Sequence, residues 1–394
     1  MNIRYLLIAI SLLAINSLRA QENQASKFGQ GLFNLIGKDS TFTMKIGARM
    51  QFLAMSSWQE GEANESNFLV RRARFKFDGF ALTPKLKYKI ELGASNRDIA
   101  GASEYTSNAP RYILDAVIKW NFHKNFVLWF GQTKLPGNRE RIISSANMQL
   151  VDRSLLNRRF NIDRDLGIQL RHHFNISDTF IIKEAFAISQ GEGRNITSGN
   201  IGGHQYTTRI EFLPFGNFSG NGDYVGSSLQ REATSKLAIG VTYDYNNNAV
   251  KTRSNQGDYM INENGDFHET NISTLFIDAM FKYKGVSFMA EYANRNADDV
   301  FYTNEDNEIK AVQIGNALNL QAGYLFKKNW EISGRYTNID WNKRIENQNE
   351  NQYTIGVSKY IVGHKLKVQS DISHLETTNS NNELMYRLQF EIHF

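Results

Sequence analysis

The side chains best suited to chemistry in this sequence are arginines and lysines that recur at every second position. Arg72, Arg74 and Lys76 alternate with apolar residues, and so do Lys45 and Arg49. A guanidinium group carries a planar fork of donors that matches the oxygens of phosphate or carboxylate, and it stays charged at any physiological pH. Such residues along one face of a strand would attract and bind oxyanions.

A second group of basic residues lies in one long connection, residues 135–164, which contains Arg139, Arg141, Arg153, Arg158, Arg159 and Arg164 together with Glu140, Asp152 and Asp163. Two interpretations are open. The guanidinium groups either contact a solute or pair with nearby acids and brace the connection, as Asp152 with Arg153 and Asp163 with Arg164 would do. We count Arg139, Arg141, Arg153, Arg158 and Arg159 as candidate anion contacts. Replacing these residues, apart from Arg153, by alanine should then weaken any anion preference.

The composition limits the class of protein. The chain has 394 residues, with 45 Lys and Arg, 40 Asp and Glu, and no Cys. Residues 1–20 have the basic start, apolar middle and small last residue of a signal peptide. Without them the basic and acidic residues nearly balance, so we expect no nucleic-acid partner. The lack of Cys excludes disulfides and Cys-based metal or redox chemistry, and we expect no metal and no cofactor.

The rest of the chain is organised by alternation. No apolar stretch after the signal peptide reaches the roughly 18 residues of a spanning helix. Residues 21–40 are a polar lead-in, which we place in the periplasm, and from residue 41 apolar and polar residues alternate with a period of two, the signature of strands with one polar face. Sixteen segments show this pattern: 41–53, 68–80, 85–93, 113–122, 126–134, 165–174, 179–190, 205–213, 235–245, 273–284, 286–293, 317–325, 330–337, 352–360, 365–372 and 384–394.

The connections between these segments alternate in length. Turns of a few residues, such as that between 113–122 and 126–134, are followed by longer connections, of which 135–164 is the longest. Short turns at one end and long loops at the other are typical of outer-membrane β-barrels. Residues 214–234 break the rule because they form a long connection at the short end, and we interpret them as a long periplasmic turn.

The last segment supports a membrane barrel. Its even positions from Leu384 to Phe394 are apolar, and Phe394 is the final residue of the sequence. This resembles the carboxyl-terminal strand of bacterial outer-membrane proteins, which implies recognition by the barrel assembly machinery. A soluble β-sandwich would also alternate, but it would seldom keep so polar an inner face through sixteen strands. We therefore predict an all-β protein, a 16-stranded antiparallel transmembrane β-barrel over residues 41–394, in contact with the lipid of the bacterial outer membrane.

Strand phase assigns the charged residues to an inner, water-facing wall. In the first three segments this wall has eight basic and two acidic residues, whereas in the last eight it has six basic and seven acidic ones. The positive field is therefore confined to the amino-terminal part of the wall. We expect an anion path there that includes Lys45, Arg49, Arg72, Arg74 and Lys76.

Three stretches resemble the phosphate-selective porin O and P family. They are Phe68–Gly79, Ile113–Ile118 with Gly131–Pro136, and Ser154-Leu155 followed by Asp165–Gly167. The resemblance implies a 16-stranded, trimeric channel in which the third loop, residues 135–164, folds inward and forms a basic constriction for small anions such as phosphate. Asp115 and Glu140 depart from a purely basic pattern, so a preference for anions is better supported than selectivity for phosphate.

Other functions stay open. A porin for sugars or general small solutes is the nearest alternative, because the wall also offers amide side chains such as Gln51, Gln169 and Gln321. A barrel enzyme would need a catalytic constellation, and the sequence shows no nucleophile elbow or comparable motif. We therefore expect a channel and not an enzyme. A plugged structural barrel would be distinguished by its lack of conductance.

Overall fold

The computed structural model describes residues 27–99, 101–197, 201–345 and 348–394. The predicted signal peptide and the first part of the lead-in lie outside the described residues. No helix in the described part of the chain has the length and apolar character needed to cross a membrane.

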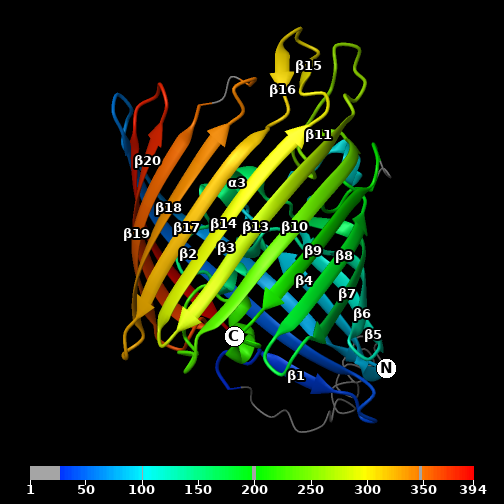
Figure 1. Ribbon diagram of the computed structural model, residues 1–394, viewed down its shortest axis with the longest axis vertical. Helices are drawn as coiled ribbons and strands as arrows, with labels where there is room; N and C mark the ends of the chain where they lie inside the picture. Colours follow the sequence, from blue (N-terminus) through cyan, green and yellow to red (C-terminus); the bar gives the residue numbers. More distant parts are fainter. Residues whose placement is uncertain (1–26, 100, 198–200, 346–347) are drawn as a thin grey trace, which may run out of the picture.

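Sixteen antiparallel strands close into a barrel, which confirms the predicted fold (Figure 1). Closure comes from the pairing of the first barrel strand with the last, in which Gln51 lies opposite Glu391. The barrel strands are β2 (Thr43–Gln59), β3 (Glu65–Ala81), β4 (Thr83–Gly93), β5 (Ile113–His123), β6 (Phe126–Lys134), β7 (Arg164–Asn175), β8 (Ile181–Ser189), β9 (Gln205–Leu213), β10 (Lys236–Ala249), β13 (Thr270–Tyr283), β14 (Val286–Ala297), β17 (Gly315–Leu325), β18 (Trp330–Trp341), β19 (Glu350–Tyr360), β20 (Leu366–Thr377) and β21 (Glu383–His393).

Several strands run further than the alternation predicted, mainly at the end with the long loops. β2 continues to Gln59 and β10 continues to Ala249. The added residues are largely polar, so they break the apolar row without interrupting the backbone hydrogen bonds of the sheet. Above a membrane, such residues can face water on both sides.

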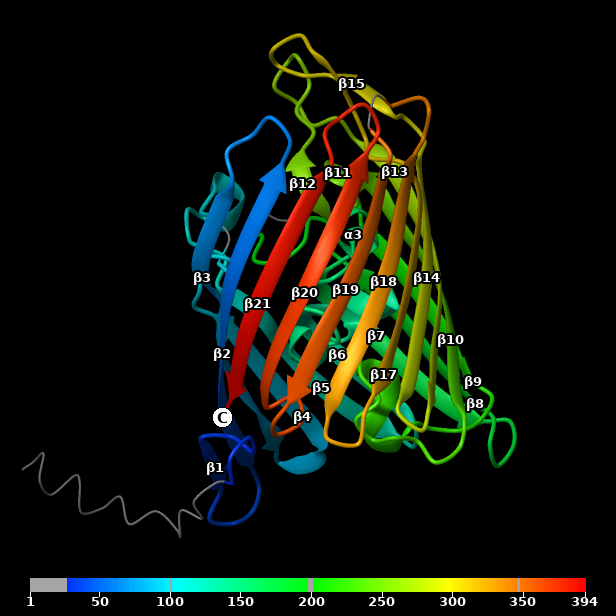
Figure 2. The ribbon, with the colours of Figure 1, turned by 90° about the vertical axis from the view of Figure 1, so that its left-hand side faces the viewer.

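The smaller elements lie at the two ends of the barrel or inside its lumen. They are β1 (Phe33–Ile36), η1 (Glu104–Thr106), η3 (Ser219–Tyr224), the hairpins β11 (Lys251–Arg253) with β12 (Gln256–Tyr259) and β15 (Phe301–Thr303) with β16 (Ile309–Ala311), and three short helices described below. β1 was not predicted. It pairs with the start of β2 where β21 has ended, so that the lead-in fills the place beside the carboxyl terminus (Figure 2).

Side chains in the barrel are arranged in the reverse of a soluble protein. In β14 the apolar Phe288 and Tyr292 are exposed on the outer face, whereas Ser287, Glu291 and Arg295 are buried inside. An apolar outer face over a polar inner one suits a barrel surrounded by lipid. The inner row is therefore the part of each strand that can build a site.

One irregularity changes which residues face inward. Gln51 pairs with Arg72 and Phe52 pairs with Val70, so Arg71 is an extra residue that forms a β-bulge in β3. Arg71 and Arg72 both line the interior as a result. The bulge adds a guanidinium group that strict alternation would have placed in lipid.

The connection between β6 and β7, which we call loop 3, folds into the barrel (Figure 1). It contains α2 (Arg139–Ile142), η2 (Ser145–Asn147) and α3 (Leu155–Phe160). Leu156 and Phe160 are fully buried in an apolar cluster with wall residues, and Phe160 stacks on Trp341 of β18 at 5.4 Å between ring centroids. Loop 3 thus packs against β14, β17 and β18 and leaves the side of β2 to β7 open.

A buried guanidinium group fixes the start of loop 3. Arg139 is fully buried, and its Nε donates to Asp278 of β13 at 2.6 Å while its Nη2 lies 3.3 Å from Glu211 of β9. Arg209 bridges the same two carboxylates from the wall. Arg139 is therefore a brace that no solute can reach, which corrects our expectation that it contacts anions.

We predict that Arg139→Ala lowers the free energy of unfolding by about 3–5 kcal/mol, because the change leaves buried carboxylates without their partner. Urea unfolding of the refolded barrel, followed by tryptophan fluorescence, measures this. Arg158→Ala is the matched control: this exposed arginine of the same loop should change stability by no more than about 0.5 kcal/mol. Equal stabilities of the two variants would contradict the brace.

Candidate functional site: the basic half of the lumen

The open side of the barrel holds a cavity of about 810 Å³ between loop 3 and the strands β2 to β7. Fifteen basic side chains line it against five acidic ones, Glu91, Asp98, Asp115, Asp152 and Asp163. The basic ones are Arg71, Arg72, Arg74, Lys89, Arg97, Lys119, Lys134, Arg141, Arg153, Arg158, Arg164, Arg171, Arg194, Arg253 and Arg387. The lining of this cavity therefore has a large excess of basic over acidic side chains.

Three wall arginines surround one carboxylate of loop 3. Asp152 lies 3.0 Å from Arg71, 3.6 Å from Arg72 and 3.8 Å from Arg387, while Arg335 donates to its backbone carbonyl at 2.8 Å. Burial opposes ionisation of Asp152, but the charges of Arg71, Arg72 and Arg387 outweigh it and hold the pKa of this carboxyl below its ordinary value. Arg387 also pairs with Asp371 of β20 at 2.7 Å, so the three arginines exceed the two carboxylates by one positive charge.

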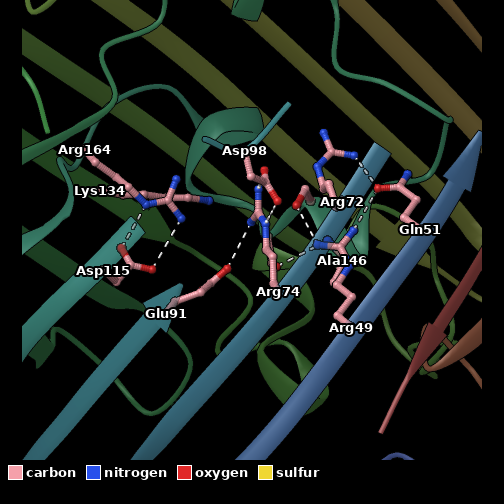
Figure 3. A network of polar contacts seen from close by, with 12 residues as sticks. Arg49, Gln51, Arg72, Arg74, Glu91, Asp98, Asp115, Lys134, Ala146 and Arg164 are labelled. Atoms are coloured by element: carbon pink, nitrogen blue, oxygen red, sulfur yellow. Dashed lines mark hydrogen bonds and ion pairs between the residues drawn. The ribbon is translucent and has the colours of Figure 1, made fainter. Parts of the chain in front are cut away.

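The middle of the cavity is a chain of shared ion pairs between β3, β4 and β5 (Figure 3). Arg74 donates to Asp98 at 2.5 Å and to Glu91 at 3.0 Å. Asp115 in turn accepts from Lys89 at 2.6 Å and from Arg164 at 3.0 Å. Three cations, Arg74, Lys89 and Arg164, thus face three acids, so this part of the wall is cross-linked and balanced in charge.

Other cations of the cavity are satisfied by neutral groups. Lys134 donates to the backbone carbonyls of Arg141, Ile142 and Ile143 at 2.6–3.2 Å. Arg153 donates to the carbonyls of Glu140 and Ile143 at 3.0 and 2.8 Å. A carbonyl meets the hydrogen-bonding needs of a cation without adding a full negative charge, so these contacts bring no carboxylate to either side chain.

An aromatic ring holds two further cations. Trp129 of β6 lies in the lining, with Lys119 at 3.6 Å and Arg171 at 4.1 Å from the ring centroid. In this strand Trp129 faces inward and Phe130 faces outward. Cation–π contacts orient the two charges towards water without neutralising them.

The hairpin of β11 and β12 also enters the lumen. Arg253 donates to the backbone carbonyl of Arg158 at 2.6 Å, and the side chain of Asn255 accepts from the backbone N–H of Asp163 at 3.3 Å. The long-loop mouth of the cavity therefore carries Arg158 from loop 3 and Arg253 from this hairpin. Arg194, from the connection after β8, lies in the same lining.

The structure brings five of the ten predicted site residues to the cavity, namely Arg72, Arg74, Arg141, Arg153 and Arg158. The other five lie elsewhere. Arg49 is buried against Glu391 at 2.8 Å, Lys76 pairs with Asp78 at 2.9 Å, and Arg159 pairs with Glu350 at 2.7 Å. Lys45 is half-buried near the start of β2, and Arg139 is the brace described above.

The loop arginines differ in position, because some border the cavity and others only brace the loop. Arg141 binds Asp163 through its Nε at 2.6 Å and still borders the cavity. Asp163 also lies 3.6 Å from Arg164, as the sequence suggested, whereas Asp152 pairs with wall arginines and not with its neighbour Arg153.

Several lining residues were missed, for different reasons. Lys119 and Arg171 lie in phase with the polar rows of their strands. Alternation therefore predicts that both face inward, although neither was among the predicted site residues. Arg71 required the bulge, which no local pattern marks. Arg194 and Arg253 lie in connections, where no periodicity predicts the direction of a side chain.

Comparison with known proteins agrees with this architecture. The sequence matches the family model for phosphate-selective porin O and P over residues 42–392. An uncharacterized protein of Aquifex aeolicus is 23% identical over 89% of this chain and 86% of its own length. Among solved structures, an anion-selective porin from Comamonas acidovorans has a TM-score of 0.55 at 10% identity, with 90% of this chain and 100% of that chain covered.

A second solved structure is the trimer form of OmpT, an outer membrane protein of Vibrio cholerae, with a TM-score of 0.52 at 11% identity and coverage of 89% and 99%. At such identities the likeness concerns the fold. The family match spans nearly the whole barrel, and the closed 16-stranded architecture carries an apolar outer face and a water-filled lumen. The chain therefore belongs to the phosphate-selective porin O and P family and is a porin of the bacterial outer membrane.

Proposed function

We propose that this porin is a diffusion channel with a preference for anions, and that the anions pass between loop 3 and strands β2 to β7. One observation carries the proposal: fifteen basic and five acidic side chains line the cavity on this side of the lumen. The positive potential raises the local concentration of anions and lowers that of cations. Diffusion through the path needs no conformational cycle and no cofactor.

The arrangement favours passage over tight binding. An anion gives up part of its hydration shell in exchange for fixed donors, and it can leave only if that binding stays weak or is divided among several sites. The path offers successive groups: Arg158 and Arg253 at the mouth, Arg153 with Lys134 in the middle, and Lys119 with Arg171 below. The attraction is thus divided among several groups of the proposed path.

Phosphate-like oxyanions are the solutes we propose. Most cations of the lining are arginines, whose donor forks match tetrahedral oxyanions better than lysine does. The arginine cluster around Asp152 already holds a carboxylate, so its geometry suits an oxygen anion. The family name and the anion-selective relative from Comamonas acidovorans point in the same direction.

We also propose that the protein is a homotrimer and that Phe394 serves recognition by the barrel assembly machinery. The trimer form of OmpT supports the first point. For the second, the terminal strand closes the barrel, and the backbone N–H of Phe394 donates to Ala48 of β2 at 2.9 Å. Light scattering of the protein in mild detergent, corrected for bound detergent, should give a mass of three chains, and a monomer would contradict the trimer.

Neutralising cavity cations that pair with no carboxylate in the described part of the chain should reduce the anion preference and keep the fold. We predict that Lys119→Met, Arg158→Gln and Arg171→Gln together shift the zero-current potential in a KCl gradient away from the chloride equilibrium value. The three residues line the path, and their contacts are with an aromatic ring, an amide or solvent.

The matched control removes three charges outside the cavity, by replacing the exposed Lys327, Lys328 and Lys343 with glutamine or methionine. Its zero-current potential should equal that of the unchanged protein. The proposal fails if the unchanged channel prefers potassium, and the assigned path fails if the cavity and control variants behave alike. Block of the chloride current by phosphate then tests the proposed solute.

The anion preference should be constant from about pH 7 to about pH 5. Burial acts against the charged form of Asp98, Asp152 and Asp163, but the neighbouring arginines dominate and lower the pKa of each carboxyl. A lowered pKa means that these carboxylates lose their charge only below about pH 4, the ordinary range of Asp. Acid beyond that point removes negative charge from the path.

The measurement is the zero-current potential as a function of pH. It should move further towards the chloride value below about pH 4, and Asp152→Asn should show part of that shift already at pH 7. A change that is complete between pH 7 and 5 would contradict the assignment, because it would require a different titrating group.

A further inference from the structure

Residues 214–234 connect β9 to β10 at the short-turn end and fold up into the barrel; we call them the periplasmic plug (Figure 2). Tyr224 donates from its hydroxyl to Glu211 of β9 at 2.7 Å, and Asp223 pairs with Lys183 of β8 at 2.8 Å. The sequence predicted only a long turn at this place. The contacts instead anchor the segment to the inner wall.

The plug continues along the same side of the wall to strands β13 and β17. Lys282 of β13 donates to the backbone carbonyls of Val225 and Ser227 at 2.7 and 2.6 Å. Arg231 reaches the end of β17, where its Nη1 donates to the carbonyl of Leu325 at 2.8 Å. A segment fixed at β8, β9, β13 and β17 covers the lower opening of this half of the barrel.

The plug also supports loop 3 from below. The backbone N–H of Gly226 donates to the carbonyl of Asn147 at 2.8 Å, and Arg139 donates to the carbonyl of Asp223 at 3.0 Å. Phe218 is buried in an apolar cluster that includes Ile143 of loop 3. Loop 3 and the plug thus close one half of the lumen at two successive levels.

The closed half differs in charge from the open half. Its wall carries Glu211, Asp278 and Glu331 beside Arg209 and Lys282, all buried, so acids and bases nearly balance. The plug lies wholly within the described residues, and none of it belongs to the lining of the basic cavity. If the closed half conducted, it would offer a parallel route without selection for anions.

We propose that the periplasmic plug is a determinant of selectivity: together with loop 3 it blocks the charge-balanced half of the lumen, so that all ions must pass through the basic half. The inference rests on the proposed anion preference. It adds that the preference depends on blocking one route as well as on the charges along the other.

Accessibility of introduced cysteines tests the blockage directly, because the chain contains no Cys. Ser287 lies in the closed half, is 1% exposed, and pairs in register with Lys282, which binds the plug. Ser144 is an exposed residue of the cavity lining and is the matched control. Both Ser287→Cys and Ser144→Cys are treated with sulfonatoethyl methanethiosulfonate, a small anionic thiol reagent, in the otherwise intact channel.

We expect Ser144→Cys to react and lose current, and Ser287→Cys to stay protected with its current unchanged. Rapid labelling of Ser287→Cys in the intact protein would overturn the proposal. This comparison requires no change to the plug, so it stands even if a plug variant fails to assemble.

Removal of the plug tests its own contribution. Residues 219–231 are replaced by a short Gly-Ser linker, and the control is the same replacement of residues 304–308 at the tip of the exposed β15–β16 hairpin. The plug deletion should raise the single-channel conductance, expose Ser287→Cys to the reagent and move the zero-current potential towards zero. The hairpin deletion should do none of these. Phe218→Ser with Tyr224→Ala is a milder variant that should show the same changes to a smaller extent.

The possible results separate the two proposals. If Ser287→Cys stays protected after the deletion, loop 3 alone closes this half and the role of the plug is refuted. If conductance rises while the zero-current potential stays the same, the plug blocks a route but does not set selectivity, and the inference also fails. A cation-preferring unchanged channel would refute the proposed function alone, since the cysteine results do not depend on its sign.

Discussion

The attachment of loop 3 to one side of the barrel is the constraint on which the other features depend. A barrel of sixteen strands is wider than a selective path needs to be. A loop that was not attached to the wall would have no fixed position in this space. The contact of Arg139 with Asp278 and Glu211, together with the packing of Phe160 on Trp341, holds the loop against β9 to β18. The remaining space lies along β2 to β7, where the basic residues are.

Charge distribution and loop position therefore reinforce each other. On the closed side, carboxylates and guanidinium groups are buried together, and removing one partner of such a pair is costly. On the open side, water solvates the groups, so cations can outnumber acids without destabilising the barrel to the same extent. The burial of one half is consistent with its balanced charge, and the solvation of the other is consistent with its basic excess.

Most of the fold could be predicted from the sequence, because alternation with a period of two indicates both that a segment is a strand and which of its side chains face the lumen. It also located the basic part of the wall, since strand phase assigns Arg72 and Arg74 to the lumen. It could not show that Arg139 is buried, because that depends on acids more than 70 positions away in the chain. Nor could it reveal the bulge at Arg71, which shifts the phase of β3 by one residue without a local signal.

The hydrogen-bond partners of a basic side chain determine whether its charge can act on a passing ion. Arg74 pairs with two carboxylates, which stiffen the wall and neutralise most of its charge. Lys134 and Arg153 are held by backbone carbonyls, which fix their positions without a carboxylate hydrogen-bond partner. A row made only of the first kind would be neutral, and a row made only of free, mobile cations would be poorly ordered. In the anion path that we propose, interleaving the two kinds keeps the wall rigid and leaves an excess of positive charge, so that an anion is attracted without being trapped.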